Sequence, residues 1–124
     1  NTEILEMTVQ PSMESLSEAI MELRSFLTSN GLSPHNVNTA AVCSEEFVNN
    51  VIRHGQATSI DLSVNLKGGD VNILIHDDGM AFNPVDMIKS NDEKIGLGLA
   101  LANAFCKEID YKYIFNQNMV SLKI

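Results

Sequence analysis

The chain has 124 residues, a length that fits one domain with its own hydrophobic core. Its 16 acidic residues outnumber its 8 basic ones, so the formal net charge is −8, which argues against direct binding of nucleic acid. The apolar runs are too short to span a bilayer and no signal segment is found, so we expect no membrane association and a cytoplasmic location. A nucleotide is still compatible with this charge, because it needs only local donors and a metal ion.

The first half of the sequence predicts one strand and two helices. Residues 3–9 are a candidate for a short strand. A helix follows, capped either by Ser12 or by Ser15, which fits a capping box, and it ends near Asn30. A second helix is predicted from Ser33–Pro34 to about His54, because proline favours the first helical turn after a serine cap.

The second half predicts mostly strands, together with one further helix. No repeat, linker or low-complexity tract interrupts the chain, so residues 1–124 are expected to form a single domain. The element order indicates an α+β sandwich, with helices on one face of a mostly antiparallel, mixed sheet. The predicted elements are a strand over 58–66, a turn over 67–70, a strand over 71–77, an irregular stretch with one helical turn over 82–95, a helix from about 98 to 107, and a hairpin of YKYIF and MVSLKI joined by NQN.

A polar stripe marks the second predicted helix. On a helical wheel Glu46, Asn50 and His54 lie along the rim of the core face, whereas Glu45 and Asn49 point toward solvent. A carboxylate can orient or deprotonate a nucleophile, and an amide oxygen is a ligand suited to Mg²⁺. The alternative interpretation is a solvated helix face, in which His54 only complements the helix dipole.

An aspartate extends the apolar row of the strand over 71–77. Asp77 shares a side with three aliphatic residues, so its carboxylate is costly unless it accepts a hydrogen bond. It could accept one from the exocyclic amine of adenine, and Gly79 would let the backbone approach a flat ligand closely. Alternatively, Asp77 only ends the strand and opens a turn with Asp78 and Gly79.

Glycines precede the third predicted helix. Free backbone amides at a helix start such as Gly96–Gly98 suit a phosphate group. The polar run from Lys89 to Lys94 could fold over the phosphates, although lysines there also serve ordinary solubility. Elsewhere, Cys43 and Cys106 form no metal or redox motif, and two buried free thiols are favoured over a disulfide.

The motifs resemble those of one superfamily when they are taken in chain order. E-x-x-x-N on a helix, D-x-G-x-A-F after a strand and G-x-G-x-x-L at a helix start resemble the GHKL ATPases. The stretch SEEFVNNVIRHG is most similar to the bacterial anti-sigma factor serine/threonine kinases. The resemblance implies a two-layer α/β sandwich that binds ATP and Mg²⁺.

The resemblance also implies roles for individual residues. Glu46 matches the general base, Asn50 the Mg²⁺ ligand and Asp77 the adenine-binding aspartate. The sequence departs from the family pattern where Ala81 replaces a glycine and Lys94 replaces an arginine. The remaining positions around the nucleotide are Gly79, Ala81, Lys94, Gly96, Gly98 and Leu99.

The function implied by the resemblance is transfer of the γ-phosphate of ATP to a serine or threonine of an anti-anti-sigma (STAS-type) protein, with sequestration of a sigma factor. A homodimer is compatible with this function. Two alternatives stay open: a nucleotide-binding switch without significant kinase activity, and the ATPase domain of a larger sensor kinase.

Overall fold

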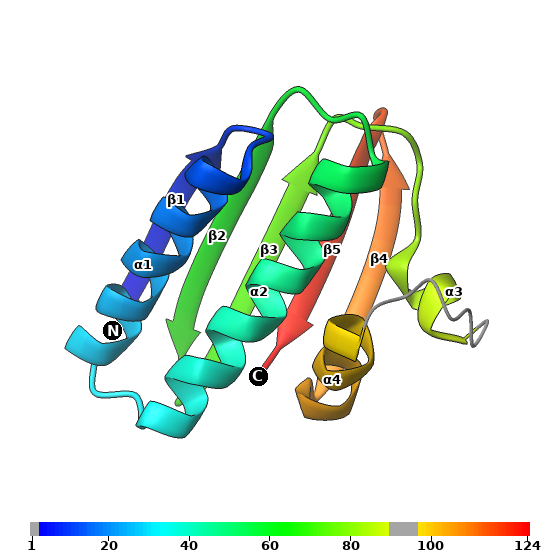
Figure 1. Ribbon diagram of the computed structural model, residues 1–124. Coiled ribbons are helices and arrows are strands. Elements are labelled where there is room, and N and C mark those ends of the chain that lie inside the picture. Colours follow the sequence, from blue (N-terminus) through cyan, green and yellow to red (C-terminus); the bar gives the residue numbers. More distant parts are fainter. Residues whose placement is uncertain (1–2, 90–96) are drawn as a thin grey trace.

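The computed structural model describes residues 3–89 and 97–124, with residues 87–89, 97–99 and 101 described by their backbone alone. It is a five-stranded sheet with helices on one face, and its strand order is β1-β2-β3-β5-β4 (Figure 1). The α+β class predicted from the sequence is therefore confirmed. The elements are β1 Glu3–Val9, α1 Met13–Ser29, α2 Pro34–His54, β2 Ile60–Lys67, β3 Asp70–Asp77, α3 Pro84–Lys89, α4 Leu97–Phe105, β4 Glu108–Ile114 and β5 Gln117–Lys123.

The sheet is antiparallel throughout its described strands, so the mixed pairing included in the prediction is not found there. The register places Ile60 opposite both Val9 and Asp77, and Asp77 opposite Asn118 as well. The C-terminal strand β5 lies between β3 and β4, inside the sheet (Figure 1). Asp77 therefore has a side chain of the last strand as its direct neighbour.

The core lies between the sheet and the two long helices. From α1, Leu16, Leu23 and Leu27 are fully buried, and α2 adds Phe47 and Val48. The strands contribute inward-facing aliphatic residues at alternate positions, as a half-buried strand requires. In Figure 1 the helices lie on one side of the sheet and leave the other side open.

Serine caps start both long helices. Ser12 Oγ accepts a hydrogen bond from the Ser15 N–H at 3.2 Å, so Ser12 is the cap of α1. Ser15 Oγ instead accepts from the Gln10 N–H at 2.9 Å, which resolves the choice that the sequence left open. Ser33 Oγ accepts from the Asn36 N–H at 3.1 Å, and this confirms the predicted start of α2.

The last hairpin differs from its prediction in the position of the turn. Phe115 and Asn116 have φ of 55° and 61°, so they form the turn, and Gln117 and Asn118 belong to β5. A two-residue turn with positive φ at both positions matches the right-handed twist of the flanking strands. The predicted turn NQN had instead placed Asn118 outside the sheet.

No helix in the described part of the chain is both long and apolar enough to cross a membrane.

Candidate active site

Asp77 is a buried carboxylate at the end of β3. Only 4% of it is exposed, and its Oδ1 accepts hydrogen bonds from the Gly79 N–H at 2.9 Å and from Asn118 Nδ2 at 3.0 Å. Burial raises the pKa of Asp77, while these two hydrogen bonds act in the opposite direction. The other oxygen, Oδ2, accepts no hydrogen bond from the described residues. Asp77 therefore offers one oxygen atom to a donor on a ligand.

Asn118 lies beside Asp77 in the candidate site and was not predicted from the sequence. Only 2% of it is exposed, and Nδ2 donates both to Asp77 and to the Met80 carbonyl oxygen, the latter at 2.8 Å. Its Oδ1 accepts from the Phe82 N–H at 3.1 Å and from the Tyr111 hydroxyl. One amide therefore fixes both Asp77 and the segment that follows it. The two-residue turn sets Asn118 opposite Tyr113 of β4, whereas its position opposite Asp77 comes from the pairing of β5 with β3, which no local pattern in the sequence predicts.

We expect Asn118→Ala to lower the free energy of unfolding by about 1–3 kcal/mol, because it removes the buried amide that donates to Asp77 Oδ1 and to the Met80 carbonyl oxygen and that accepts from the Phe82 N–H. It should also weaken nucleotide binding, since Asp77 loses a fixed neighbour. Urea denaturation measures the first effect and calorimetry the second. The control is Asn65→Ala, because Asn65 Oδ1 on β2 has no partner among the described residues. Equal, small losses for both variants would contradict the role of Asn118.

Gly79 is required by a contact within the protein. A Cβ atom there would lie 2.2 Å from the Gly55 carbonyl oxygen and 3.0 Å from Asp77 Oδ1. The Met80 N–H donates to the same Gly55 oxygen at 2.7 Å. Gly79 was predicted to let the backbone approach a flat ligand, and in the structure it lets the Asp77 segment pack on the end of α2. Ala81, two residues later, is exposed.

Glu46 and Asn50 lie one turn apart on α2, and both are half-buried. Asn50 Nδ2 donates to the Glu46 backbone oxygen at 2.7 Å, so the amide nitrogen is tied to the helix and Oδ1 is left without a partner among the described residues. The Glu46 carboxylate likewise makes no hydrogen bond or ion pair with them. The pair therefore presents a free amide oxygen and a free carboxylate.

The oxygen atoms of Glu46 and Asn50 suit Mg²⁺ held together with phosphate groups better than they suit a metal ion held by protein side chains alone. Within residues 3–89 and 97–124, no group of three or more His, Cys, Asp or Glu side chains could hold a metal ion. Mg²⁺ is usually held by one or two protein oxygens together with phosphate oxygens and water. Asn50 Oδ1 can supply one such oxygen, so any Mg²⁺ here would depend on the phosphates of a nucleotide.

The neighbours of this pair differ from their predicted positions in one respect. Glu45 is exposed, as the wheel predicts. Asn49 was predicted to point toward solvent, and this is wrong, because it is half-buried and its Oδ1 is buried with no partner in the described residues. The wheel treats the helix as isolated, whereas packing against other elements buries part of its outer side.

The residues around Asp77 have structural roles. The exposed Asp78 accepts hydrogen bonds from the N–H groups of Thr58, at 2.8 Å, and Ser59, at 3.1 Å, and from the Thr58 hydroxyl. These bonds lower the pKa of Asp78. The ring of His54 stacks on Phe82, with 6.0 Å between centroids and 19° between planes. Asp78 therefore anchors the turn, and the Asp77 oxygen Oδ2 is not needed for it.

The predicted phosphate-binding residues are described only in part. Lys94 and Gly96 lie outside the described residues. Gly98 and Leu99 lie in the first turn of α4, which packs beside α2 (Figure 1). The start of this helix agrees with the prediction to within about one residue.

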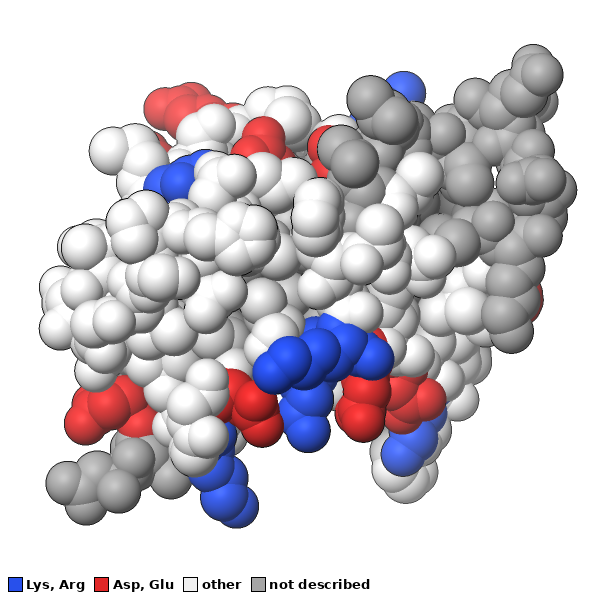
Figure 2. Space-filling model, turned by 90° about the horizontal axis from the view of Figure 1, so that it is seen from below, with Lys and Arg blue, Asp and Glu red and all other residues white. Residues whose placement is uncertain are grey.

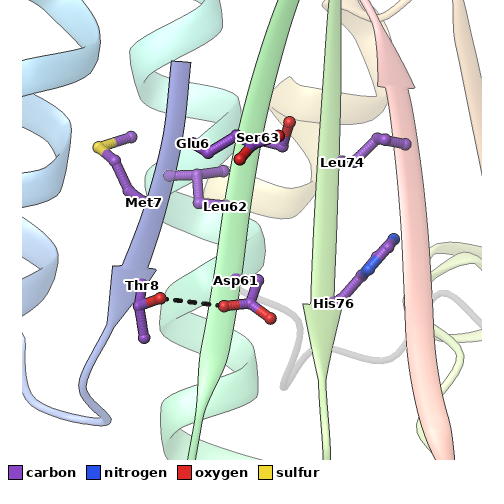
Figure 3. Close-up of a pocket in the computed structure, with 8 residues that line it drawn as sticks. All are labelled: Glu6, Met7, Thr8, Asp61, Leu62, Ser63, Leu74 and His76. Carbon is purple, nitrogen blue, oxygen red and sulfur yellow. Dashed lines mark hydrogen bonds between the residues drawn. The ribbon is translucent and has the colours of Figure 1, made fainter. Parts of the chain in front are cut away.

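A hollow of about 610 Å³ lies on the open face of the sheet (Figure 3). Its polar residues include Thr8 and Asp61, whose side chains are hydrogen-bonded at 3.2 Å, and His76 (Figure 3). None of the predicted site residues lines it. The predicted site and this hollow are therefore separate.

Charged groups of both signs share the end of the molecule that carries the α1–α2 connection. Figure 2 shows basic and acidic side chains beside one another there, without a continuous basic surface. On the described chain, Asp70 lies 3.3 Å from Lys107 Nζ and 3.9 Å from Lys123 Nζ. Among the described residues, the charges at this end of the molecule are therefore mixed in sign.

The antiparallel sheet with helices on one face and a buried aspartate at the end of an inner strand is the fold of the GHKL ATPases. The chain belongs to the family of the histidine kinase-like ATPase domain, whose family model matches residues 9–124. Membership implies that the chain binds ATP.

Two solved structures illustrate the similarity. The RsbU and RsbW domains of Rv1364c from Mycobacterium tuberculosis match with a TM-score of 0.75 and 22% identity, covering 98% of this chain and 32% of that chain. The histidine kinase AdeS of Acinetobacter baumannii matches with a TM-score of 0.56 and 18% identity, covering 100% of this chain and 66% of that chain. No curated protein matches the chain. At these identities the two structures show the shared fold alone.

Proposed function

We propose that the chain is a serine/threonine protein kinase that transfers the γ-phosphate of ATP to a STAS-type anti-anti-sigma protein and also binds a sigma factor. The observation that carries the proposal is the Glu46 carboxylate, half-buried and without a partner in the described residues, one turn from the Asn50 amide oxygen. A protein that only binds a nucleotide has no need of a free carboxylate at that position.

Each residue has a distinct part in this chemistry. Asp77 Oδ2 accepts a hydrogen bond from the exocyclic amine of adenine, while Asn118 holds the other carboxylate oxygen. Asn50 Oδ1 would help to hold Mg²⁺, which would neutralise charge on the phosphates. Glu46 takes the proton of the substrate hydroxyl as that oxygen attacks the γ-phosphorus, and the bond from this phosphorus to the β–γ bridging oxygen breaks to release ADP.

The substrate class rests on the sequence more than on the fold. The stretch SEEFVNNVIRHG, residues 44–55, resembles the anti-sigma factor kinases and contains both Glu46 and Asn50. The ATPase domain of a sensor kinase and a nucleotide-binding switch would share this fold. The choice among the three is therefore a question of what accepts the phosphate.

The test is incubation of the chain with labelled ATP, Mg²⁺ and STAS-type proteins encoded beside it. We expect label on one serine or threonine of one such protein, and none when that residue is changed to alanine. If the domain is instead part of a larger sensor kinase, the label should appear on a histidine of that kinase. Binding of ATP without transfer to any partner would leave only the switch.

Asn50→Ala should lower the affinity for ATP by about tenfold or more when Mg²⁺ is present. In a chelator its affinity should equal that of the wild type, because only the metal contact is lost. Calorimetry under both conditions measures the difference. The control is Asn49→Ala, on the same turn of α2. This variant should bind ATP as tightly as the wild type does, both in Mg²⁺ and in chelator. An Asn50→Ala defect that persists in chelator would mean that Asn50 acts on the nucleotide or on the fold, and not through Mg²⁺.

A further inference from the structure

Two thiols that are far apart in the sequence lie in contact. Cys43 is on α2 and Cys106 follows the last residue of α4, 63 positions later, yet their Sγ atoms are 3.8 Å apart. Both are free thiols, Cys43 fully buried and Cys106 half-buried. The distance is that of two touching sulfur atoms, and a disulfide needs about 2.05 Å. Neither the ATP site nor the proposed kinase chemistry uses them.

The environment of the two thiols is unequal. The Cys106 thiol donates a hydrogen bond to Cys43 Sγ, and this bond lowers the pKa of Cys43. The same bond, together with burial, raises the pKa of Cys106. A thiolate is the attacking form in thiol–disulfide exchange, so Cys43 is suited to the second, internal attack. Cys43 is buried, however, so an oxidant in solution can reach only the half-buried Cys106, which therefore reacts first.

We propose that Cys43 and Cys106 form an oxidation site that reacts with low-molecular-weight disulfides and closes an intramolecular disulfide. The Cys106 sulfur, on losing its proton, attacks the oxidant RSSR, and the departing RS⁻ takes that proton. The Cys43 thiolate then attacks the Cys106 sulfur of the mixed disulfide and expels the second RS⁻, which is protonated by the proton that Cys43 has released. In sum, two protein thiols and one RSSR give one protein disulfide and two RSH.

The cross-link would join α4 to α2 one turn before Glu46. The residues between the two cysteines include β2, β3, the Asp77 segment and the start of α4. Oxidation would therefore hold the end of α4 against α2 and restrict how far this helix can move. Formation of the disulfide does not depend on the proposed kinase activity, so it is measured on the protein itself.

The experiment treats the folded protein with oxidised glutathione and reads intact mass and thiol content. We expect the wild type to lose two hydrogens, retain no glutathione and run as a monomer on a non-reducing gel. Its Tm should rise by roughly 5–15 °C, because the cross-link constrains the unfolded chain. A reductant should reverse both changes.

Two single variants separate the roles of the thiols. Cys43→Ala should keep a stable glutathione adduct on Cys106, since no second thiol resolves it. Cys106→Ser should stay unmodified, because Cys43 is buried. The proposal is overturned if the wild type keeps two free thiols, keeps the adduct, forms linked dimers, or loses thermal stability when the bond forms.

Discussion

Glu46→Ala is expected to slow phosphate transfer by about 10²–10⁴-fold, the usual contribution of a general base. ATP affinity should stay close to that of the wild type, because the residue proposed to contact adenine is Asp77 and not Glu46. The helix should also persist, since alanine is a better helix former than glutamate. Single-turnover transfer to the STAS-type substrate measures the rate, and calorimetry measures the affinity.

Glu45→Ala is the matched control for this variant. Glu45 is the preceding residue on α2 and is exposed, so its removal should change neither the rate nor the affinity. If the two variants transfer phosphate at the same rate, Glu46 is not the base. If Glu46→Ala loses ATP binding as well, the carboxylate acts on the nucleotide and the assignment of the base fails.

Asp77→Asn is expected to weaken ADP binding by about ten- to a hundred-fold, the effect of losing one hydrogen bond to a charged group. The direction follows from the contacts of the carboxylate. Gly79 and Asn118 both donate to Oδ1, so the oxygen of an introduced asparagine would stay there and its NH₂ group would replace Oδ2. A donor would then face the donor of adenine. Calorimetry with ADP measures the loss.

The pH dependence of the free energy of unfolding shows whether Asp77→Asn loses only its contact with the ligand or also damages the fold. Burial raises the pKa of Asp77, so the ionised carboxylate costs folding free energy that an amide would not. The pKa of Asp77 is about 3.9 in the unfolded chain and higher in the folded protein. As pH rises through this interval, the free energy of unfolding of the wild type should therefore fall relative to that of Asp77→Asn. We therefore expect Asp77→Asn to be at least as stable at pH 7 by urea denaturation.

Asp78→Asn is the paired control for binding, because Asp78 contacts only the turn at Thr58 and Ser59 among the described residues. It should bind ADP as the wild type does. Unchanged ADP affinity in Asp77→Asn would remove the adenine assignment.

Local patterns in the sequence were sufficient for most of the fold. The serine cap of α2 depends on neighbours within a few residues, and so does the alternation that places Asp77 on the inner side of β3. Such features depend on residues that are near one another in the sequence, so they can be predicted without knowledge of tertiary contacts.

Contacts between distant segments could not be read in the same way. Asn118 belongs to the site because β5 pairs with β3 and sets Asn118 opposite Asp77, 41 positions away in the sequence. The turn at Phe115–Asn116, which places Asn118 within β5, was also hard to predict, because Phe115 is not a residue that favours positive φ. Gly79 is explained by the carbonyl group of Gly55, which lies in another connection. The contact of Cys43 with Cys106 likewise follows from the packing of α4 on α2.

The position of β5 has a consequence for how the protein is made. A nascent chain emerges from the ribosome N-terminus first, so β1 has no strand to pair with until β2, which begins at Ile60, has also emerged. β3 gains its second neighbour only when β5 emerges, at Gln117–Lys123. Because that strand is interior and carries Asn118, every shorter nascent chain exposes one edge of β3 and lacks the residue that fixes Asp77. Neither the sheet nor the nucleotide site is therefore complete until translation has passed the final strand.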